Sequence, residues 1–202
     1  VEPLPGSQHV GKQSGQFTHY GDQALVLLRS LATSGQFDKY HFAELWRDFW
    51  TAGSSYVDQA TKGTLANMEQ GKDLDQVGSG SNDLAGAARV APLIYLMGND
   101  VQALVQACRD QTQLTHRDGT VVDSAEFFAR VVVDVLSGKK PIQSIQDTAL
   151  GSFADLPAAK WVQAGLDAAD RESVQAIRDL GPTCHAPQAF PSTVQLIARH
   201  EE

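Results

Sequence analysis

Cysteine is scarce in this sequence: the 202 residues include only Cys108 and Cys184. These two lie far apart and show no metal-ligand spacing, which argues against a zinc site built on paired cysteines. Disulfides persist mainly in oxidising compartments, so we interpret both residues as reduced thiols of a cytoplasmic protein.

Long apolar runs and a basic charge excess are also missing. No run approaches the roughly 20 apolar residues of a membrane span, and no signal peptide is recognisable. Lys and Arg number 16 against 24 Asp and Glu, a formal net charge of −8. This balance disfavours nucleic acid or an anionic membrane as the main partner, although a local basic pocket stays open. The content of 42% hydrophobic and 20% charged residues is that of a globular protein.

Alternating apolar patterns, the signature of half-buried strands, are absent, whereas helical periodicity recurs along the chain. The run at residues 131–133 fits a strand or a helix, but the length of its segment and the stop at Gly138 favour a helix. We therefore predict an all-α fold, a single-domain orthogonal helical bundle. One segment, "HFAELWRDFW", places its apolar side chains on one face: Phe42, Leu45, Trp46, Phe49 and Trp50.

The two ends predict a single domain over residues 1–202 that lacks its first and last segments. The sequence begins at Val1, and "STVQLIARHEE" at the other end has helical periodicity without a stop signal. Acidic residues in this last turn also oppose the helix dipole.

One helix start carries side chains that could bind a ligand or take part in a reaction. In "SGQFTHYGDQALVLLRSLA", Thr18, His19, Tyr20 and Asp22 precede or open an amphipathic helix. Thr18 or Asp22 could simply cap the helix. The alternative is that these oxygen and imidazole groups face a ligand or a cation, because a helix N-terminus offers free N–H groups and a positive dipole end.

A second stretch is rich in glycine and serine. Glycines let backbone N–H groups approach a phosphate, although a flexible loop followed by a helix cap explains the pattern equally well. The stretch matches neither the nucleotide P-loop nor the Rossmann fingerprint. Its residues are Gly78, Ser79, Gly80, Ser81, Asn82 and Asp83.

The remaining polar candidates are isolated. His116, in "QLTHRDGT", is one of six histidines, none of which forms an i, i+4 pair of the zincin type. Such a residue is more often solvated or capping than catalytic, and Glu2 taken alone is just a terminal acid.

Taken together and in order, these stretches resemble the ADP-ribosylglycohydrolase family, all-helical enzymes that remove ADP-ribose from proteins or small molecules. "GQFTHYGDQALVLLRSL" resembles the family's Gly-x-x-Thr-Asp-Asp-Thr helix start, and "RVAPL" matches its Arg-x-Ala-Pro-Leu segment. "LTH" followed by "AEFFA", "CHAPQAFPSTVQLI" and Val1-Glu2 resemble further family segments. The resemblance runs over nearly the whole chain.

The resemblance implies roles for the candidate residues. Glu2 corresponds to the catalytic carboxylate, and His19 would be a base or a metal ligand oriented by Asp22. Thr18 and Asp22 would be the remaining metal ligands. The loop of Gly78, Ser79, Gly80 and Ser81 would cradle the diphosphate of ADP-ribose, and His116 would contact the ligand near it. We expect these residues to converge on one cleft.

The chain also departs from the family pattern. Members hold two magnesium ions with a Thr-Asp-Asp and a later Asp-x-Asp, an oxygen-rich ligation that suits this hard cation. Here the first motif reads Thr18-His19-Tyr20, and the sequence stops before the second. His19 and Tyr20 would hold a different metal, bind ADP-ribose without metal, or be a relic. We predict that this chain does not bind a magnesium pair.

Two functions follow from this pattern. The first is a hydrolase that cleaves the glycosidic bond of an ADP-ribosylated protein or small molecule, with the isolated segment itself inactive. The second is a non-catalytic ADP-ribose-binding or crystallin-like structural protein on the same fold. Neither predicts nucleic acid or a membrane as a partner.

Overall fold

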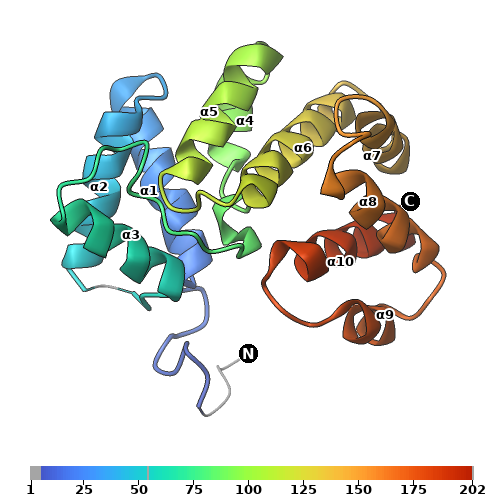
Figure 1. Ribbon diagram of the computed structural model, residues 1–202, viewed down its shortest axis with the longest axis horizontal. Helices are drawn as coiled ribbons and strands as arrows, with labels where there is room; N and C mark the ends of the chain where they lie inside the picture. Colours follow the sequence, from blue (N-terminus) through green and yellow to red (C-terminus); the bar gives the residue numbers. More distant parts are fainter. Residues whose placement is uncertain (1–5, 54, 202) are drawn as a thin grey trace.

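The computed structural model describes residues 6–53 and 55–201, and within these it consists of helices and connecting loops without a strand. The all-α prediction is confirmed (Figure 1). The elements are α1 (His19–Ser34), α2 (Lys39–Thr51), α3 (Gln59–Glu69), the short 3₁₀ helix η1 (Leu84–Gly86), α4 (Ala91–Met97), α5 (Val101–Gln113), α6 (Gly119–Leu136), α7 (Pro141–Leu150), α8 (Pro157–Asp167), α9 (Ser173–Leu180) and α10 (Ala186–Arg199).

Aspartate side chains begin several of these helices, because each carboxylate accepts hydrogen bonds from N–H groups that have no partner within the helix. Asp38 accepts from two N–H groups at the start of α2, and Asp118 accepts from one at the start of α6. The cap of α5 is Asp100, whose carboxylate accepts from the N–H of Ala103. Helix α6 contains residues 131–133, which settles the strand-or-helix ambiguity in favour of a helix.

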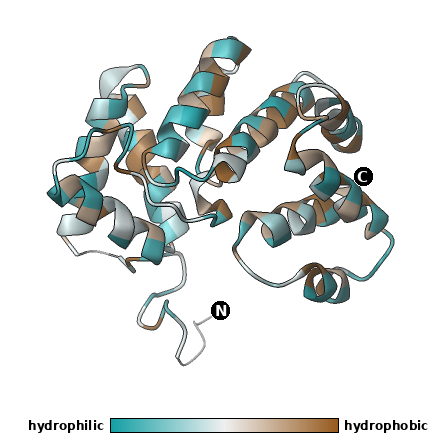
Figure 2. Cartoon of the chain, in the orientation of Figure 1, coloured by the Kyte–Doolittle hydropathy of each residue, from teal (hydrophilic) through white to brown (hydrophobic). Residues whose placement is uncertain are grey.

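The helices form two groups with separate hydrophobic clusters, and α6 contributes to both (Figure 1). The first cluster gathers side chains from α1, α2, α4 and α5, including Trp46 and Trp50, whose expected core positions are confirmed. The second is built around Phe127, Ile145 and Phe190 from α6, α7 and α10. In Figure 2 the hydrophobic residues of most helices face the neighbouring helices, while hydrophilic residues cover the outside.

An extended segment between α3 and α4 joins the two groups. Ser79 forms an isolated parallel bridge with His116, and its N–H donates to the carbonyl of Thr115 at 3.0 Å. Asp83 forms an antiparallel bridge with His185, at the start of α10. Asp83 and the N-terminal ends of α1, α3 and α10 line one pocket.

No helix in the described parts of the chain is long and apolar enough to cross a membrane. Both cysteines are free thiols, Cys108 buried and Cys184 exposed.

Candidate functional site

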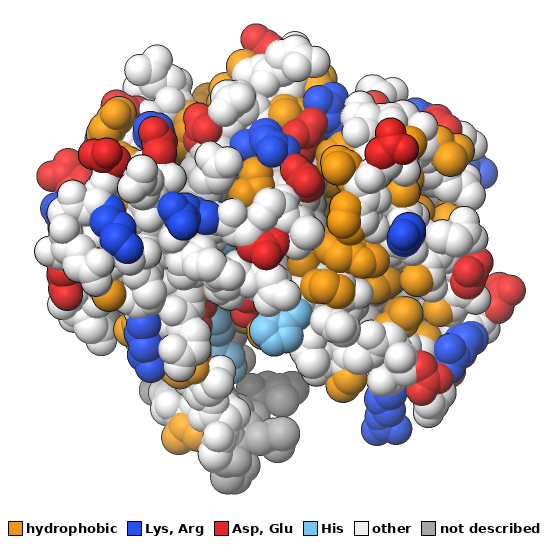
Figure 3. All heavy atoms as spheres, viewed as in Figure 1, with side chains coloured by type: hydrophobic (Ala, Val, Ile, Leu, Met, Phe, Trp, Pro, Cys, Tyr) orange, Lys and Arg blue, Asp and Glu red, His pale blue; other side chains and the backbone are white. Residues whose placement is uncertain are grey.

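A small pocket lies where the two helix groups meet, and we call it the junction pocket. Its volume is about 230 Å³. It is built from the first turn of α1, the loop before α3, the segment that joins the two groups, and the start of α10. On the face shown in Figure 3, histidine side chains lie beside acidic ones at the notch between the two halves. The lining residues are Gln8, His19, Tyr20, Tyr56, Asp58, Gln59, Ala60, Ser81, Asp83, Cys184 and His185.

His19 is the most buried polar residue of this pocket, with 3% of its surface exposed. Its Nε2 lies 3.6 Å from Oδ2 of Asp58, too far for a good hydrogen bond, so their attraction depends on the charge of the imidazole. Burial lowers the pKa of His19, and the charge of Asp58 opposes this effect only in part. The Nδ1 atom is buried without a hydrogen-bond partner in the described structure.

Aromatic rings surround this imidazole. The ring of Tyr20 is centred 4.0 Å away and the ring of Tyr56 5.3 Å away, the latter edge-on. His9 stacks on the imidazole at 5.6 Å. His9 belongs to residues 6–17, which we call the N-terminal strap, so this segment closes over the inner wall of the junction pocket.

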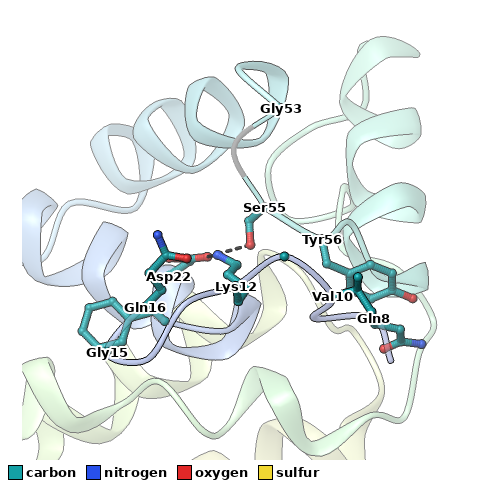
Figure 4. Close-up of a pocket in the computed structure, with 11 residues that line it drawn as sticks. Gln8, Val10, Lys12, Gly15, Gln16, Asp22, Gly53, Ser55 and Tyr56 are labelled. Carbon is teal, nitrogen blue, oxygen red and sulfur yellow. Dashed lines mark hydrogen bonds and ion pairs between the residues drawn. The ribbon is translucent and has the colours of Figure 1, made fainter. Parts of the chain in front are cut away.

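Asp22 does not orient His19, contrary to our expectation. Its Oδ2 accepts a hydrogen bond from the hydroxyl of Ser55 at 2.6 Å and lies 3.5 Å from Nζ of Lys12 (Figure 4). The carboxylate thus holds the N-terminal strap, while Asp58 is the acidic neighbour of His19.

Asp22 lines a second, larger hollow of about 680 Å³, which we call the strap groove (Figure 4). The groove and the junction pocket share Gln8 and Tyr56, so they are neighbours. Lys12 is the only amine among the described residues that line the groove.

Thr18 occupies the N-cap position of α1, but its side chain makes no capping hydrogen bond. Its carbonyl accepts from the N–H of Asp22 at 2.9 Å. Thr18 does not line the junction pocket or the strap groove, so its predicted role as a metal ligand has no geometric support here.

Only part of the Gly/Ser loop at residues 78–81 is free to contact a ligand. Ser81 lines the junction pocket. The N–H groups of Ser79 and Ser81 already donate, to the carbonyl of Thr115 and to the hydroxyl of Ser79 respectively. Gly78 is tightly enclosed, since a Cβ there would lie 2.1 Å from the carbonyl oxygen of Gln113. A diphosphate cradle made by all four backbone N–H groups is therefore not available in this geometry.

His116 lies behind this loop and does not line the junction pocket. It is 1% exposed, and its Nδ1 lies 2.9 Å from the hydroxyl of Thr115. Burial, followed by the positive charge of Arg89, lowers the pKa of His116 to about 3. The predicted direct contact with a ligand would require the surrounding chain to move, and a structural role fits the observed burial.

The predicted residues thus converge in part. His19 and Ser81 share the junction pocket, and Asp22 lies in the neighbouring groove. Glu2 lies outside the described residues. The sequence pattern gave no site role to several residues that line the pocket. Tyr56 and Asp58 lie outside the stretches singled out, whereas Asp83, Cys184 and His185 lie inside them.

The described residues do not fit a magnesium pair. They contain no group of three or more His, Cys, Asp or Glu side chains that could hold a metal ion. The pKa of Tyr20 is raised to about 12, first by burial, so its phenol is neutral at pH 7 and supplies no charge to a dication. Imidazole, as in His19, suits transition metals better than magnesium.

The family of the chain is established by its sequence. The sequence model of the ADP-ribosylglycohydrolase family matches residues 2–202, so the chain belongs to this family. Among solved structures, the chain is similar to an "ADP-ribosylglycohydrolase-related protein complex", with 22% identity and a TM-score of 0.72. That match covers 92% of this chain and 60% of the other, so the chain spans less than two thirds of the length of that relative. No curated protein matches the sequence significantly.

Proposed function

We propose that this chain carries the ADP-ribosyl-binding site of a hydrolase that cleaves the glycosidic bond of an ADP-ribosylated protein or small molecule. The observation that carries the proposal is the His19–Asp58 contact at 3.6 Å in the wall of the junction pocket. An imidazole beside a carboxylate is an arrangement suited to general-base chemistry. Membership of the family supports hydrolase chemistry as the reaction type.

His19 acts in this proposal as the base. Its lowered pKa keeps the imidazole neutral at pH 7, so it can accept a proton. With the N–H at Nε2 directed towards Asp58, the lone pair on Nδ1 accepts a proton from water. The water oxygen bonds to the ribose C1″ as the glycosidic bond breaks, and the departing group takes the proton from the imidazolium. Asp58 stabilises the imidazolium while it exists.

The N-terminal strap has to shift during this reaction. The Nδ1 atoms of His9 and His19 are both buried, and the two rings are stacked. Entry of a substrate between strap and pocket would expose Nδ1 of His19 to water. The strap groove would then hold the rest of ADP-ribose, since its volume of about 680 Å³ is typical of ligand sites. We place the diphosphate near Lys12, because an amine favours this anion.

The carboxylate role of Glu2 rests on the family resemblance alone. No step of the proposed mechanism passes through a metal, because the described donor set does not fit one.

The alternative is the non-catalytic ADP-ribose-binding or crystallin-like protein. One observation favours it: His19 and Tyr20 stand where the family resemblance places two metal-binding carboxylates. Binding without turnover is the behaviour that it predicts.

The test compares ADP-ribose release from ADP-ribosylated protein with ADP-ribose binding, measured as thermal protection. The variants are His19→Ala and Asp58→Asn, and the matched control is His41→Ala, whose imidazole contacts Ser30 away from the pocket. Release by the wild type that disappears in the two pocket variants, with binding retained, supports the hydrolase. Binding without release supports the non-catalytic alternative. Absence of both overturns the proposal.

A further inference from the structure

The junction pocket combines carboxylates and aromatic faces with two histidines and without Lys or Arg among its described lining residues. Among the described residues that line it, none is Lys or Arg, whereas Asp58, Asp83, Tyr20 and Tyr56 all contribute. We propose that this pocket binds an organic cation with N–H donors, of the alkylguanidinium or alkylammonium kind. Cation binding goes beyond the proposed function, because it depends on the lining of the junction pocket alone and does not require hydrolysis.

The two carboxylates keep acceptor capacity for such a ligand. Asp58 uses Oδ1 to accept from the N–H of Thr61 at 2.6 Å, and Asp83 uses Oδ1 to accept from the N–H of Ala85 at 2.8 Å. Among the described ion pairs, the only one that involves either residue is the His19–Asp58 contact. An ionised carboxylate accepts at both oxygens, so each can accept further N–H donors.

The negative charge of the two carboxylates affects the pKa values of neighbouring groups. After burial, the charge of Asp83 is the largest influence that raises the pKa of Tyr20. The pKa of Cys184 is raised to about 11 by burial and by its hydrogen bond to Asp83, with a contribution from Asp58. The negative field is therefore not balanced within the pocket, and a bound cation would balance it.

The walls provide the second element of cation recognition. The phenol rings of Tyr20 and Tyr56 both pack against His19, with centroids 4.0 and 5.3 Å from the imidazole. A cation over an aromatic face gains about 0.5–2 kcal/mol. His19, although 3% exposed, leaves Nδ1 without a partner among the described residues, and a bound N–H donor would satisfy it.

Shape and charge argue against the other small ligands. Magnesium demands near-octahedral oxygen ligation. The described residues contain no group of three or more His, Cys, Asp or Glu side chains that could supply it. A phosphate would meet two carboxylates and no Lys or Arg among the described lining residues. The volume of about 230 Å³ corresponds to about eight waters at about 30 Å³ each, which is room for a polyatomic cation but far more than a bare ion fills.

The experiment titrates the full chain with methylguanidinium, methylammonium or tetramethylammonium chloride at constant ionic strength, and follows binding by calorimetry and NMR. Tetramethylammonium has the charge but no N–H donor. The variants are Asp83→Asn and Tyr56→Leu. The matched control is Asp73→Asn, which removes the same charge from an exposed loop position.

The expected result is saturable binding of methylguanidinium or methylammonium, whichever fits better, with weaker binding of tetramethylammonium. Asp83→Asn should reduce the affinity about tenfold or more, because it removes a charge-assisted hydrogen bond, while Asp73→Asn leaves it unchanged. The inference is overturned if neither methylguanidinium nor methylammonium binds more strongly than tetramethylammonium. It is also overturned if Asp83→Asn binds these cations as tightly as the wild type.

The outcome is separable from that of the proposed function. A chain that releases ADP-ribose but ignores both N–H cations refutes the inference and leaves the hydrolase standing. A chain that binds the cations but neither binds nor releases ADP-ribose supports the inference and refutes the proposed function.

Discussion

Arg89 offers the sharpest test of how the first helix group is held together. Its side chain is 1% exposed, and its hydrogen-bond partners are all neutral: the side chains of Gln23, Gln111 and Thr115, and the carbonyl of Gln111. Burial lowers the pKa of Arg89 to about 9, which still leaves the guanidinium charged at pH 7. This one side chain links α1, α5 and the loop that carries His116.

We predict that Arg89→Met lowers the free energy of unfolding by about 2–4 kcal/mol. The change removes the donors to three buried acceptors, the side chain and carbonyl of Gln111 and the hydroxyl of Thr115, at about 1–3 kcal/mol each. Gln23 keeps a donor, because Nε1 of Trp46 also donates to it at 3.1 Å. Relief from burying a charge offsets part of the loss.

Denaturant unfolding measures this change, and thermal unfolding should show a midpoint lower by about 4–16 °C for a chain of this size. Arg89→Lys should also be destabilised, because an ammonium cannot reproduce the planar fork of donors. The matched control is Arg109→Met at the partly exposed pairs with Asp123 and Glu126, where the expected loss is about 1 kcal/mol, smaller than that of Arg89→Met. A stability of Arg89→Met equal to that of the wild type would refute the reasoning.

Three further predictions concern the site and its support. Calorimetric titration with magnesium should show no binding at a stoichiometry of two in the wild type or in His19→Ala; tight binding at that ratio would contradict the donor-set argument. Gly78→Ala should destabilise the chain by about 1–3 kcal/mol in denaturant unfolding, because the new Cβ would meet the carbonyl of Gln113 at 2.1 Å. Stability should fall on acidification below pH 6.5 by up to about 1.4 kcal/mol per unit through His116, because its lowered pKa leaves the unfolded chain binding the extra proton. This contribution is fully present above pH 6.5, and a His116→Gln variant with the same pH dependence would contradict the assignment.

The helical part of the fold could be predicted from local patterns. Apolar spacing in "HFAELWRDFW" places Phe42, Trp46 and Trp50 on one face, and all three are buried in α2. Cap positions are less certain from sequence, because neighbouring polar residues such as Asn99 and Asp100 are both suited to accept the same N–H groups, and the structure has Asp100 as the cap.

The site could be predicted only where a motif marks it. His19 and Ser81 stand in stretches whose composition draws attention, and both line the junction pocket. Asp58 and Asp83 look in the sequence like ordinary helix caps, which they also are. Asp83 reaches the start of α10 through an isolated bridge between distant segments, and such long-range pairing leaves no periodic signal in the sequence.

The double use of these two aspartates allows stability and charge to be separated. Asp58 begins α3 and Asp83 begins η1, each by accepting a backbone N–H through one carboxylate oxygen. Asparagine caps helices about as well as aspartate, because its side-chain oxygen accepts the same hydrogen bond. Asp58→Asn and Asp83→Asn therefore preserve the helix starts while removing the negative charge of the junction pocket. A loss of methylguanidinium or methylammonium binding in these variants, with unfolding unchanged, would report the charge of the pocket rather than its folding.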